Sequence, residues 1–216
     1  MRSPIEVIYN FHWVTKHEVA RSAQAYAGML GPFLRRHQIR SVVNLRGHNQ
    51  RFGWWRYESR VCERLHIEHH NLKFNSRTLP SRELLIAMLH AFDVSQKPAL
   101  IKCSGGQDRT SFAAALYLIH RDGWNALACA LQQFAKWPYL HFPKPQQKWL
   151  RMFLPYAEQQ SGGQPIGRWI AEDYTPEDFM AWLDNRGHSE SFRNLPGRPP
   201  RKLENISAGR ADGRTA

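Results

Sequence analysis

Short apolar runs alternate along the chain with longer segments in which apolar residues recur at helical spacing. The runs rich in β-branched and aromatic residues predict strands at positions 5–14, 18–21, 41–45, 67–74 and 98–102. The helical spacing predicts helices at positions 25–37, 54–66, 80–92, 110–121, 124–136, 146–159 and 175–187. Strands that alternate with helices are typical of α/β domains, so we expect a mainly parallel central sheet flanked by helices.

The composition of the chain changes toward its C-terminal end. Ser161, Gly162 and Gly163 predict a linker after a main domain that covers residues 1–160. One further short helix makes residues 161–187 a helical extension. From residue 188 the chain is rich in Pro, Gly and Arg and poor in core-forming residues, so residues 188–216 are predicted to be a disordered basic tail.

Charge and cysteine content narrow the class of protein. The chain has 216 residues, a net charge of +12 and a sequence pI near 10.1, which suggests an anionic partner such as phosphate esters, nucleic acid or an acidic membrane surface. Its three cysteines, Cys62, Cys103 and Cys129, form no CxxC pair, which favours free thiols in a reducing, cytoplasmic compartment. We expect no signal peptide, and no apolar run approaches the ~20 residues of a membrane span.

The segment KCSGGQDRTS, residues 102–111, joins the predicted strand at 98–102 to the predicted helix at 110–121. Adjacent glycines allow backbone N–H groups to turn inward, and the start of a helix adds positive potential at the same centre. Arg109 supplies a planar fork that matches two phosphate oxygens. The loop residues are therefore expected to bind a substrate phosphate: Ser104, Gly105, Gly106 and Gln107.

The same positive field would favour the thiolate of Cys103, which makes this residue a candidate nucleophile beneath a bound phosphoryl group. The Thr110 hydroxyl, next to Arg109, is placed to stabilise that thiolate when it leaves. The residues alone also allow a plainer interpretation, in which Cys103 is a structural cysteine at a strand end and the glycines only precede a helix.

Residues 103–110, Cys-Ser-Gly-Gly-Gln-Asp-Arg-Thr, resemble the CX5R signature of cysteine-dependent phosphatases, most closely the bacterial dual-specificity-like group. Three other segments resemble that group: RSAQ at 21–24, IRSVVNLR at 39–46 and YLHFP at 139–143. The resemblance covers about residues 7–155. It implies a dual-specificity phosphatase-like fold, Cys103 as nucleophile through a phosphocysteine intermediate and Arg109 as phosphate ligand.

Two positions depart from that family pattern. Lys102 stands where relatives usually carry a histidine before the cysteine. Positions 73–77, Lys-Phe-Asn-Ser-Arg, lack the aspartate that many relatives use as general acid. Asp108 is the nearest candidate for this role, since the Asp-Arg-Thr order resembles myotubularins and other phosphoinositide phosphatases, where a loop aspartate is the acid. The alternative is that Asp108 only braces the loop.

Basic residues are expected to surround the phosphate loop. Arg46, Arg77 and their neighbours His48, Arg51, Arg56 and Lys73 would form a rim that binds further substrate phosphates, although a solvated basic loop is an alternative. The spacing of Cys62, His66, His69 and His70 matches no common metal site, so no metal is predicted. His141 is interpreted as a hydrogen-bonding residue of the core or rim.

The sequence therefore predicts a phosphatase that hydrolyses phosphate monoesters and needs no cofactor. The substrate classes left open are a phosphoprotein, a phosphoinositide or inositol phosphate, and a phosphorylated polysaccharide or lipid. The alternatives are an RNA 5′-triphosphatase, a phosphate-binding pseudophosphatase and, more distantly, a rhodanese-like sulfur carrier. We expect a monomer, with an acidic membrane surface as a further partner.

Overall fold

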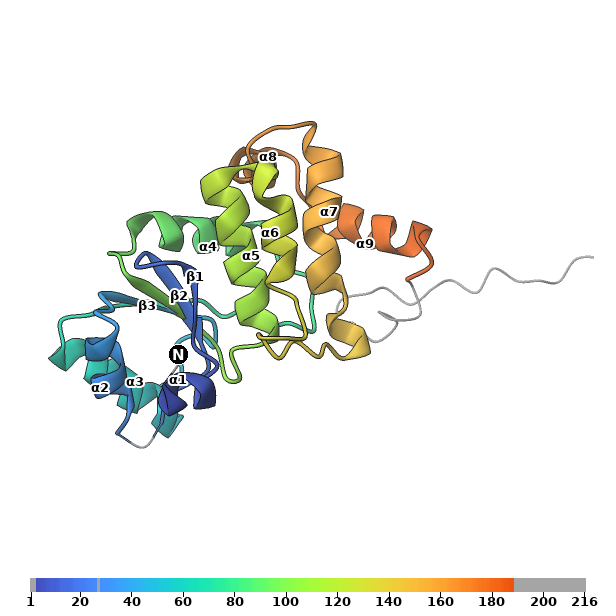
Figure 1. Ribbon diagram of the computed structural model, residues 1–216. Coiled ribbons are helices and arrows are strands. Elements are labelled where there is room, and N and C mark those ends of the chain that lie inside the picture. Colours follow the sequence, from blue (N-terminus) through green and yellow to red (C-terminus); the bar gives the residue numbers. More distant parts are fainter. Residues whose placement is uncertain (1–2, 27, 189–216) are drawn as a thin grey trace, which may run out of the picture.

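The computed structural model describes residues 3–26 and 28–188, and its centre is a five-stranded sheet (Figure 1). The strand order is β1-β2-β5-β3-β4, with bounds His12–Thr15, Val19–Ser22, Ala99–Lys102, Ser41–Asn44 and Glu68–Asn71 in that order. β1 pairs with β2 antiparallel, and the other three pairings are parallel. The predicted mainly parallel sheet is thus confirmed.

Helices cover both faces of this sheet, because neighbouring residues of each buried strand point to opposite sides. In β5, Ala99 and Ile101 join one core cluster, whereas Leu100 joins the other. The Leu100 face is covered by α1 (Pro4–Ile8), α2 (Leu30–Arg36) and α3 (Gly53–Arg64). The helices on the opposite side are α4 (Arg82–Val94), α5 (Asp108–Asp122), α6 (Leu127–Gln132) and α7 (Trp149–Ser161), and α8 (Ile166–Glu172) and α9 (Pro176–Asn185) pack on these helices.

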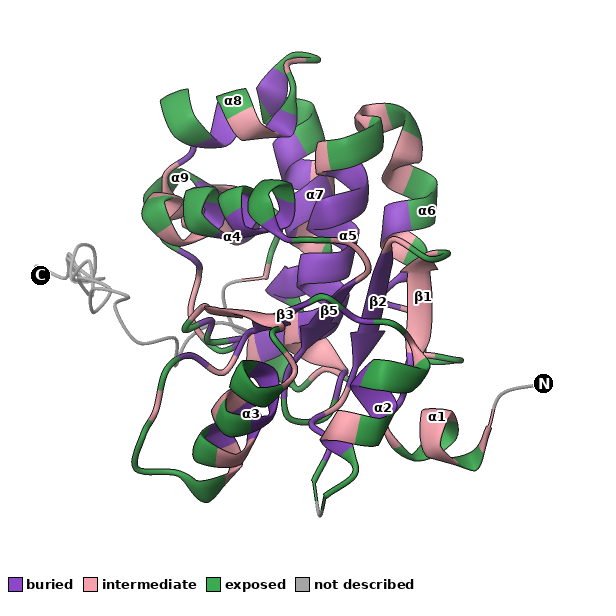
Figure 2. Cartoon of the chain, turned by 90° about the vertical axis from the view of Figure 1, so that its left-hand side faces the viewer, coloured by how far each residue is buried: buried purple, intermediate pink, exposed green. Residues whose placement is uncertain are grey.

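The helix α5 follows the phosphate-loop segment and lies in the middle of its layer. Every residue from 110 to 119 is buried, and Figure 2 shows this stretch in the colour of buried residues. Such a helix has no polar face, because β5, α4, α6 and α7 contact it from several sides. The start of α5 is therefore held firmly against the end of β5.

The predicted first strand at 5–14 is wrong in its first half, where the chain forms α1. Ser3 and Glu6 form a capping box in which the Ser3 N–H donates to the Glu6 carboxylate at 2.8 Å, and Pro4 occupies the first helical position. The apolar residues that resembled a strand are partly helical, and Ile5 packs against the α2 side of the core. At the start of α4, Ser81 caps the helix, because the Leu84 N–H donates to Ser81 Oγ at 3.3 Å.

The segment after Gly163 contains one helix that was not predicted, α8, as well as the predicted one, α9. Buried side chains of this segment belong to the same core cluster as α5 and α7: Ile166, Trp169, Ile170, Tyr174, Phe179 and Leu183. The predicted helix at 124–136 is shorter, a 3₁₀ turn at Trp124–Ala126 followed by α6. The predicted tail lies outside the described residues, apart from His188. None of the helices described is long and apolar enough to span a bilayer.

Candidate active site

A pocket of about 660 Å³ opens where β5 ends and the loop at 103–107 leads into α5. In a parallel sheet this edge is where ligands bind. Predicted site residues that line the pocket are Cys103, Ser104, Gly105, Gln107, Asp108, Arg109, Arg46 and Arg77. Gly106 and Thr110 do not line it. The pocket also contains residues that the sequence did not assign to the site, among them Lys144 and Gln147.

Cys103 lies in the wall of this pocket with only 3% of its surface exposed. Burial opposes ionisation of the thiol, but the charge of Arg109, the Thr110 hydroxyl and the backbone N–H groups of Gln107 and Gly106 outweigh it. The pKa of Cys103 is therefore lowered. Thr110 Oγ1 is buried without an oxygen or nitrogen partner among the described residues, which leaves it to the thiolate.

Arg109 projects from the first turn of α5 across the mouth of the loop. Its Nη2 donates to Ser104 Oγ at 2.9 Å, and its Nη1 donates to the Leu45 carbonyl at 3.3 Å. The two terminal nitrogens of the guanidinium are thus positioned by Leu45, which follows β3, and by Ser104 of the loop. The fork is held beside Cys103 before any ligand arrives, which reduces the entropy lost when an oxyanion binds.

Gly106 has a left-handed backbone, with φ of +63°, and its carbonyl oxygen is held from two directions. Arg21 Nη2 and Asn10 Nδ2 both donate to this oxygen at 3.0 Å. A Cβ at this position would lie 2.5 Å from the Ala23 nitrogen. The carbonyl is therefore fixed behind the loop, while the Gly106 N–H donates a hydrogen bond to the Cys103 thiolate.

Arg21 is a supporting residue that the sequence quoted only inside the RSAQ segment, without a role. It is completely buried, and besides Gly106 it donates to Ser111 Oγ at 2.8 Å and to Gln133 Oε1 at 2.9 Å. Burial lowers the pKa of Arg21 to about 10, against the opposing effects of Tyr139 and Cys103. It stays charged at neutral pH and adds a second cation behind the loop. The RSAQ resemblance was the one signal that pointed to it.

Lys102, the residue before Cys103, points away from the loop into a buried polar network. Its Nζ lies 2.6 Å from Glu58 Oε1 and donates to Gln24 Oε1 at 2.8 Å. Burial lowers the pKa of Lys102 to about 8, although Glu58 raises it. Burial also acts to raise the pKa of Glu58, but His69 and Lys102 together hold it below its usual value.

This network reaches the pocket through Gln24. The same Gln24 oxygen that binds Lys102 also accepts from Arg46 Nη1 at 3.2 Å. The Arg46 guanidinium in turn lies over the Trp54 ring, 3.5 Å from its centroid. Lys102 therefore helps to position a pocket-lining arginine.

Asp108 is the first residue of α5, and no other carboxylate of the described residues lines the pocket. Gln147 Nε2 donates to Asp108 Oδ2 at 2.8 Å, and His141 Nδ1 lies 3.2 Å from Asp108 Oδ1. Gln147 also donates to Ser76 Oγ at 2.9 Å, which ties the carboxylate to the 73–77 loop. The side chain of Asp108 is 23% exposed, so it remains open to a ligand.

Solved structures with similar backbones are phosphatases. Tk-PTP, in a mutant form, has a TM-score of 0.54 at 20% identity, covering 69% of this chain and 96% of its own. TpbA from P. aeruginosa has a TM-score of 0.50 at 16% identity, covering 86% and 95%. The core catalytic domain of the PP-IP phosphatase SIW14 from S. cerevisiae has a TM-score of 0.50 at 15% identity, covering 83% and 93%.

The chain has the fold of the cysteine-dependent phosphatases. This confirms the dual-specificity phosphatase-like fold that the CX5R resemblance implied. No protein-family model matches the chain, and no curated protein matches it in sequence.

On this phosphatase fold, only part of the predicted basic rim faces the pocket. Arg46, Lys73 and Arg77 line it, and Lys144 joins them from the segment before α7. Arg46 and Lys73 are held together by an isolated antiparallel bridge between their backbones. Lys73 takes this place because the left-handed Gly47 lets the two segments approach closely.

The other three predicted rim residues do not line the pocket. His48 packs on Trp55 at a ring distance of 4.2 Å, and Arg51 is exposed in the loop before α3. Arg56 donates to the Gln50 and Arg51 carbonyls and lines a different groove. These three residues are therefore not part of the pocket rim, because Arg56 lies on α3, which starts at Gly53, and His48 and Arg51 lie in the loop before it.

The structure also shows where the histidines and the cysteine near position 62 lie and what they contact. Burial raises the pKa of Cys62 to about 12, and the residue lies on the buried side of α3, in the core. His69 binds Glu58 at 2.9 Å, while His70 lies 3.3 Å from Glu68. Within the described ranges, no three His, Cys, Asp or Glu side chains are grouped to hold a metal.

Proposed function

We propose that this protein is a phosphatase that hydrolyses phosphate monoesters through a phosphocysteine intermediate at Cys103. The observation that carries the proposal is the lowered pKa of Cys103 inside a pocket lined by Arg109 and the phosphate loop. A thiolate is the form that attacks phosphorus, and inward N–H groups with a guanidinium are what a phosphoryl group requires.

In the first step, Cys103 Sγ attacks phosphorus and forms an S–P bond while the bond to the ester oxygen breaks. The leaving oxygen takes the proton of Asp108, which the Gln147 bond positions at the pocket edge. Arg109 and the loop N–H groups stabilise the charge that spreads over the three phosphoryl oxygens.

In the second step, water attacks the phosphocysteine and the S–P bond breaks. Asp108, now a carboxylate, accepts the proton of the attacking water, and inorganic phosphate is released. Thr110 and the Gln107 and Gly106 N–H groups stabilise the departing thiolate, as they do in the free protein. No metal is needed, because both steps use protein groups alone.

The cations of the pocket favour substrates with more than one negative group. Besides Arg109, they are Arg46, Lys73, Arg77 and Lys144. One protein of the same fold, SIW14, is a PP-IP phosphatase, which agrees with a phosphate-rich substrate for this pocket. An inositol phosphate and a phosphopeptide with acidic neighbours are therefore the first substrates to test.

The test is a substrate panel in which released phosphate is measured with and without EDTA. We expect phosphate release from an aryl phosphate, a higher kcat/KM for the acidic phosphopeptide and the inositol phosphate, and no effect of EDTA on these rates. The preference for acidic substrates should shrink as salt rises, because the cations are screened. Release of only the γ-phosphate from triphosphate-ended RNA would instead indicate an RNA 5′-triphosphatase, and phosphate binding without any release a pseudophosphatase.

Replacement of Asp108 by asparagine should slow poor leaving groups far more than good ones. An alkyl phosphate needs a proton on its leaving oxygen, so its kcat should fall by about 10²–10³-fold, whereas an activated aryl phosphate should fall by less than about tenfold. The measurement is kcat for both esters in the wild type and in Asp108→Asn.

The matched control is Asp122→Asn at the other end of the same helix, where the carboxylate pairs with Arg121. This variant should leave the ratio of the two rates unchanged. Equal slowing of both esters in Asp108→Asn would show that Asp108 only braces the loop.

A further inference from the structure

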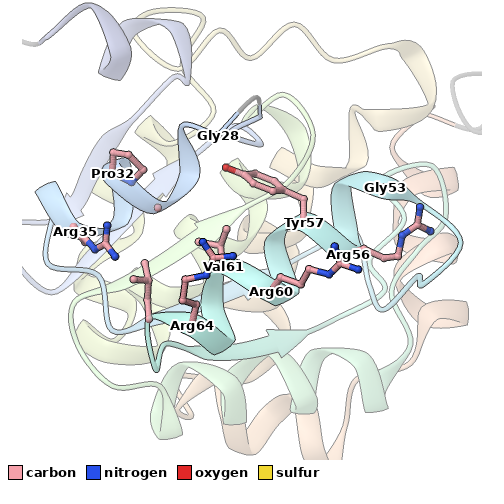
Figure 3. Close-up of a pocket in the computed structure, with 11 residues that line it drawn as sticks. Gly28, Pro32, Arg35, Gly53, Arg56, Tyr57, Arg60, Val61 and Arg64 are labelled. Atoms are coloured by element: carbon pink, nitrogen blue, oxygen red, sulfur yellow. The ribbon is translucent and has the colours of Figure 1, made fainter.

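A second cavity of about 480 Å³ lies between α2 and α3, on the face of the sheet opposite α5. Four arginines line it, three from α3 and one from α2. Their side chains are labelled in Figure 3. Among the described residues, no carboxylate lines this groove. None of the catalytic residues lines it either, so it is a separate feature of the surface.

The arginines are placed in a regular row. Arg56, Arg60 and Arg64 follow each other at four-residue spacing on α3, which sets them on one side of the helix about 6 Å apart along its axis. Arg35 faces them from α2 (Figure 3). All four are exposed, and none forms an ion pair within the described part of the chain.

The floor between the arginines is apolar and preformed. Val61, Leu65 and Pro32 line it, together with Gly31 of α2. The Tyr57 hydroxyl accepts a hydrogen bond from the Leu30 N–H at 3.2 Å, which links the two helices across the groove. The groove therefore exists before a ligand binds, so little ordering is required.

We propose that this groove binds an extended acidic peptide segment of a partner protein. In an extended peptide, every second side chain points the same way and lies about 6.6–6.8 Å further on, close to the spacing of the α3 arginines. Alternate acidic side chains would then meet Arg56, Arg60 and Arg64, and the apolar side chains between them would face the floor.

Other polyanions fit this groove less well. A single-stranded nucleic acid relies on aromatic side chains for base stacking, and of the lining residues that the structure describes only Tyr57 is aromatic. A membrane surface contacts protruding side chains, whereas the apolar residues here lie in a recess between helices. The regular arginine row over an apolar floor favours the peptide.

The position of α3 connects the groove with the phosphatase pocket. The helix begins at Gly53, which lines the groove, and the loop just before it carries the pocket residue Arg46. An acidic segment bound along α3 would therefore belong to a protein substrate that also reaches Cys103. This link rests on the proposed function, but peptide binding to the groove does not.

The test is fluorescence anisotropy with the full chain and a labelled eight-residue peptide of alternating Glu and Val. We expect saturable binding that weakens with salt, and a loss of about tenfold in affinity for Arg60→Glu and for Arg64→Glu. The control is Arg151→Glu, an exposed arginine on α7 outside the groove, which should bind the peptide as the wild type does. The double variant R60E/R64E should gain affinity for a Lys–Val peptide.

Several results would overturn the proposal: no peptide binding by the wild type, an equal loss in Arg151→Glu, or tighter binding of oligonucleotides or phosphatidylserine vesicles than of the peptide. Circular dichroism would verify folding, and Arg60→Ala replaces any glutamate variant that does not fold. Because the peptide carries no phosphate, binding in Cys103→Ser distinguishes the two ideas. If the peptide binds but the protein has no phosphatase activity, the proposed peptide site is supported and the proposed function is not. If the protein is an active phosphatase that does not bind the peptide, the proposed peptide site is wrong.

Discussion

Cys103→Ser should abolish phosphate release, with kcat on an aryl phosphate reduced by at least about 10³-fold. The positive surroundings that lower the pKa of the thiol cannot bring a serine hydroxyl to ionise near neutral pH, so the nucleophile is lost. The measurement is phosphate release at saturating substrate, together with thermal unfolding to show that the variant is folded. Activity near that of the wild type would end the phosphocysteine mechanism.

The wild type offers an internal comparison for this prediction. Iodoacetamide reacts with thiolates, so Cys103 should be alkylated with a rate that levels off at a pH below the ordinary thiol pKa of about 8.5. Cys129 is exposed and lies outside the pocket, whereas Cys62 is buried with a raised pKa and should not react. Bound phosphate should protect Cys103 and leave Cys129 unprotected.

Gly106→Ala should be the most damaging substitution in the loop that leaves every catalytic side chain in place. Its φ is left-handed, and the added Cβ would lie 2.5 Å from the Ala23 nitrogen and 2.6 Å from the Ser22 carbonyl carbon. Both neighbours are backbone atoms at the end of β2, so the loop itself must move. We expect kcat/KM to fall by about 10²-fold or more and the free energy of unfolding to drop by about 1–3 kcal/mol.

The neighbouring glycine supplies the matched control. At Gly105 the backbone is not left-handed, and an added Cβ would approach only the Gln107 side chain, at 3.6 Å. Gly105→Ala keeps the backbone N–H and should lose far less activity and stability. Steady-state kinetics and urea unfolding of both variants check this, and equal losses would contradict the role given to the Gly106 conformation.

The fold and the centre of the site were predictable because their signals are local. The strand before Cys103, the glycines and the buried helix after Arg109 are contiguous in the sequence. The residue types of this segment directly predict a strand, a tight loop and a helix. The supports of the loop were not predictable in this way. Arg21 and Asn10 bind the Gly106 carbonyl across 85 and 96 residues of chain, and only the sheet order brings them there.

Errors in the predicted elements have a similar physical origin. A short apolar stretch such as the one around Ile5 fits a strand as well as a helix, and the capping box at Ser3 decided the outcome. The contacts of Asp108 could not be predicted from the sequence either, because Gln147 and His141 come from a segment with little regular structure before α7.

The aromatic packing after Ser161 determines how short the chain can be made. Phe179 stacks on Tyr156 at 4.7 Å, and Tyr174 meets Phe153 edge-on at 5.4 Å. Gly162 ends α7 in a left-handed turn that folds the following helices back onto it. A chain cut at residue 160 would expose the rings of Phe153 and Tyr156 to water, and such an apolar patch favours self-association. We therefore expect the smallest unit that unfolds cooperatively to extend at least to Leu183.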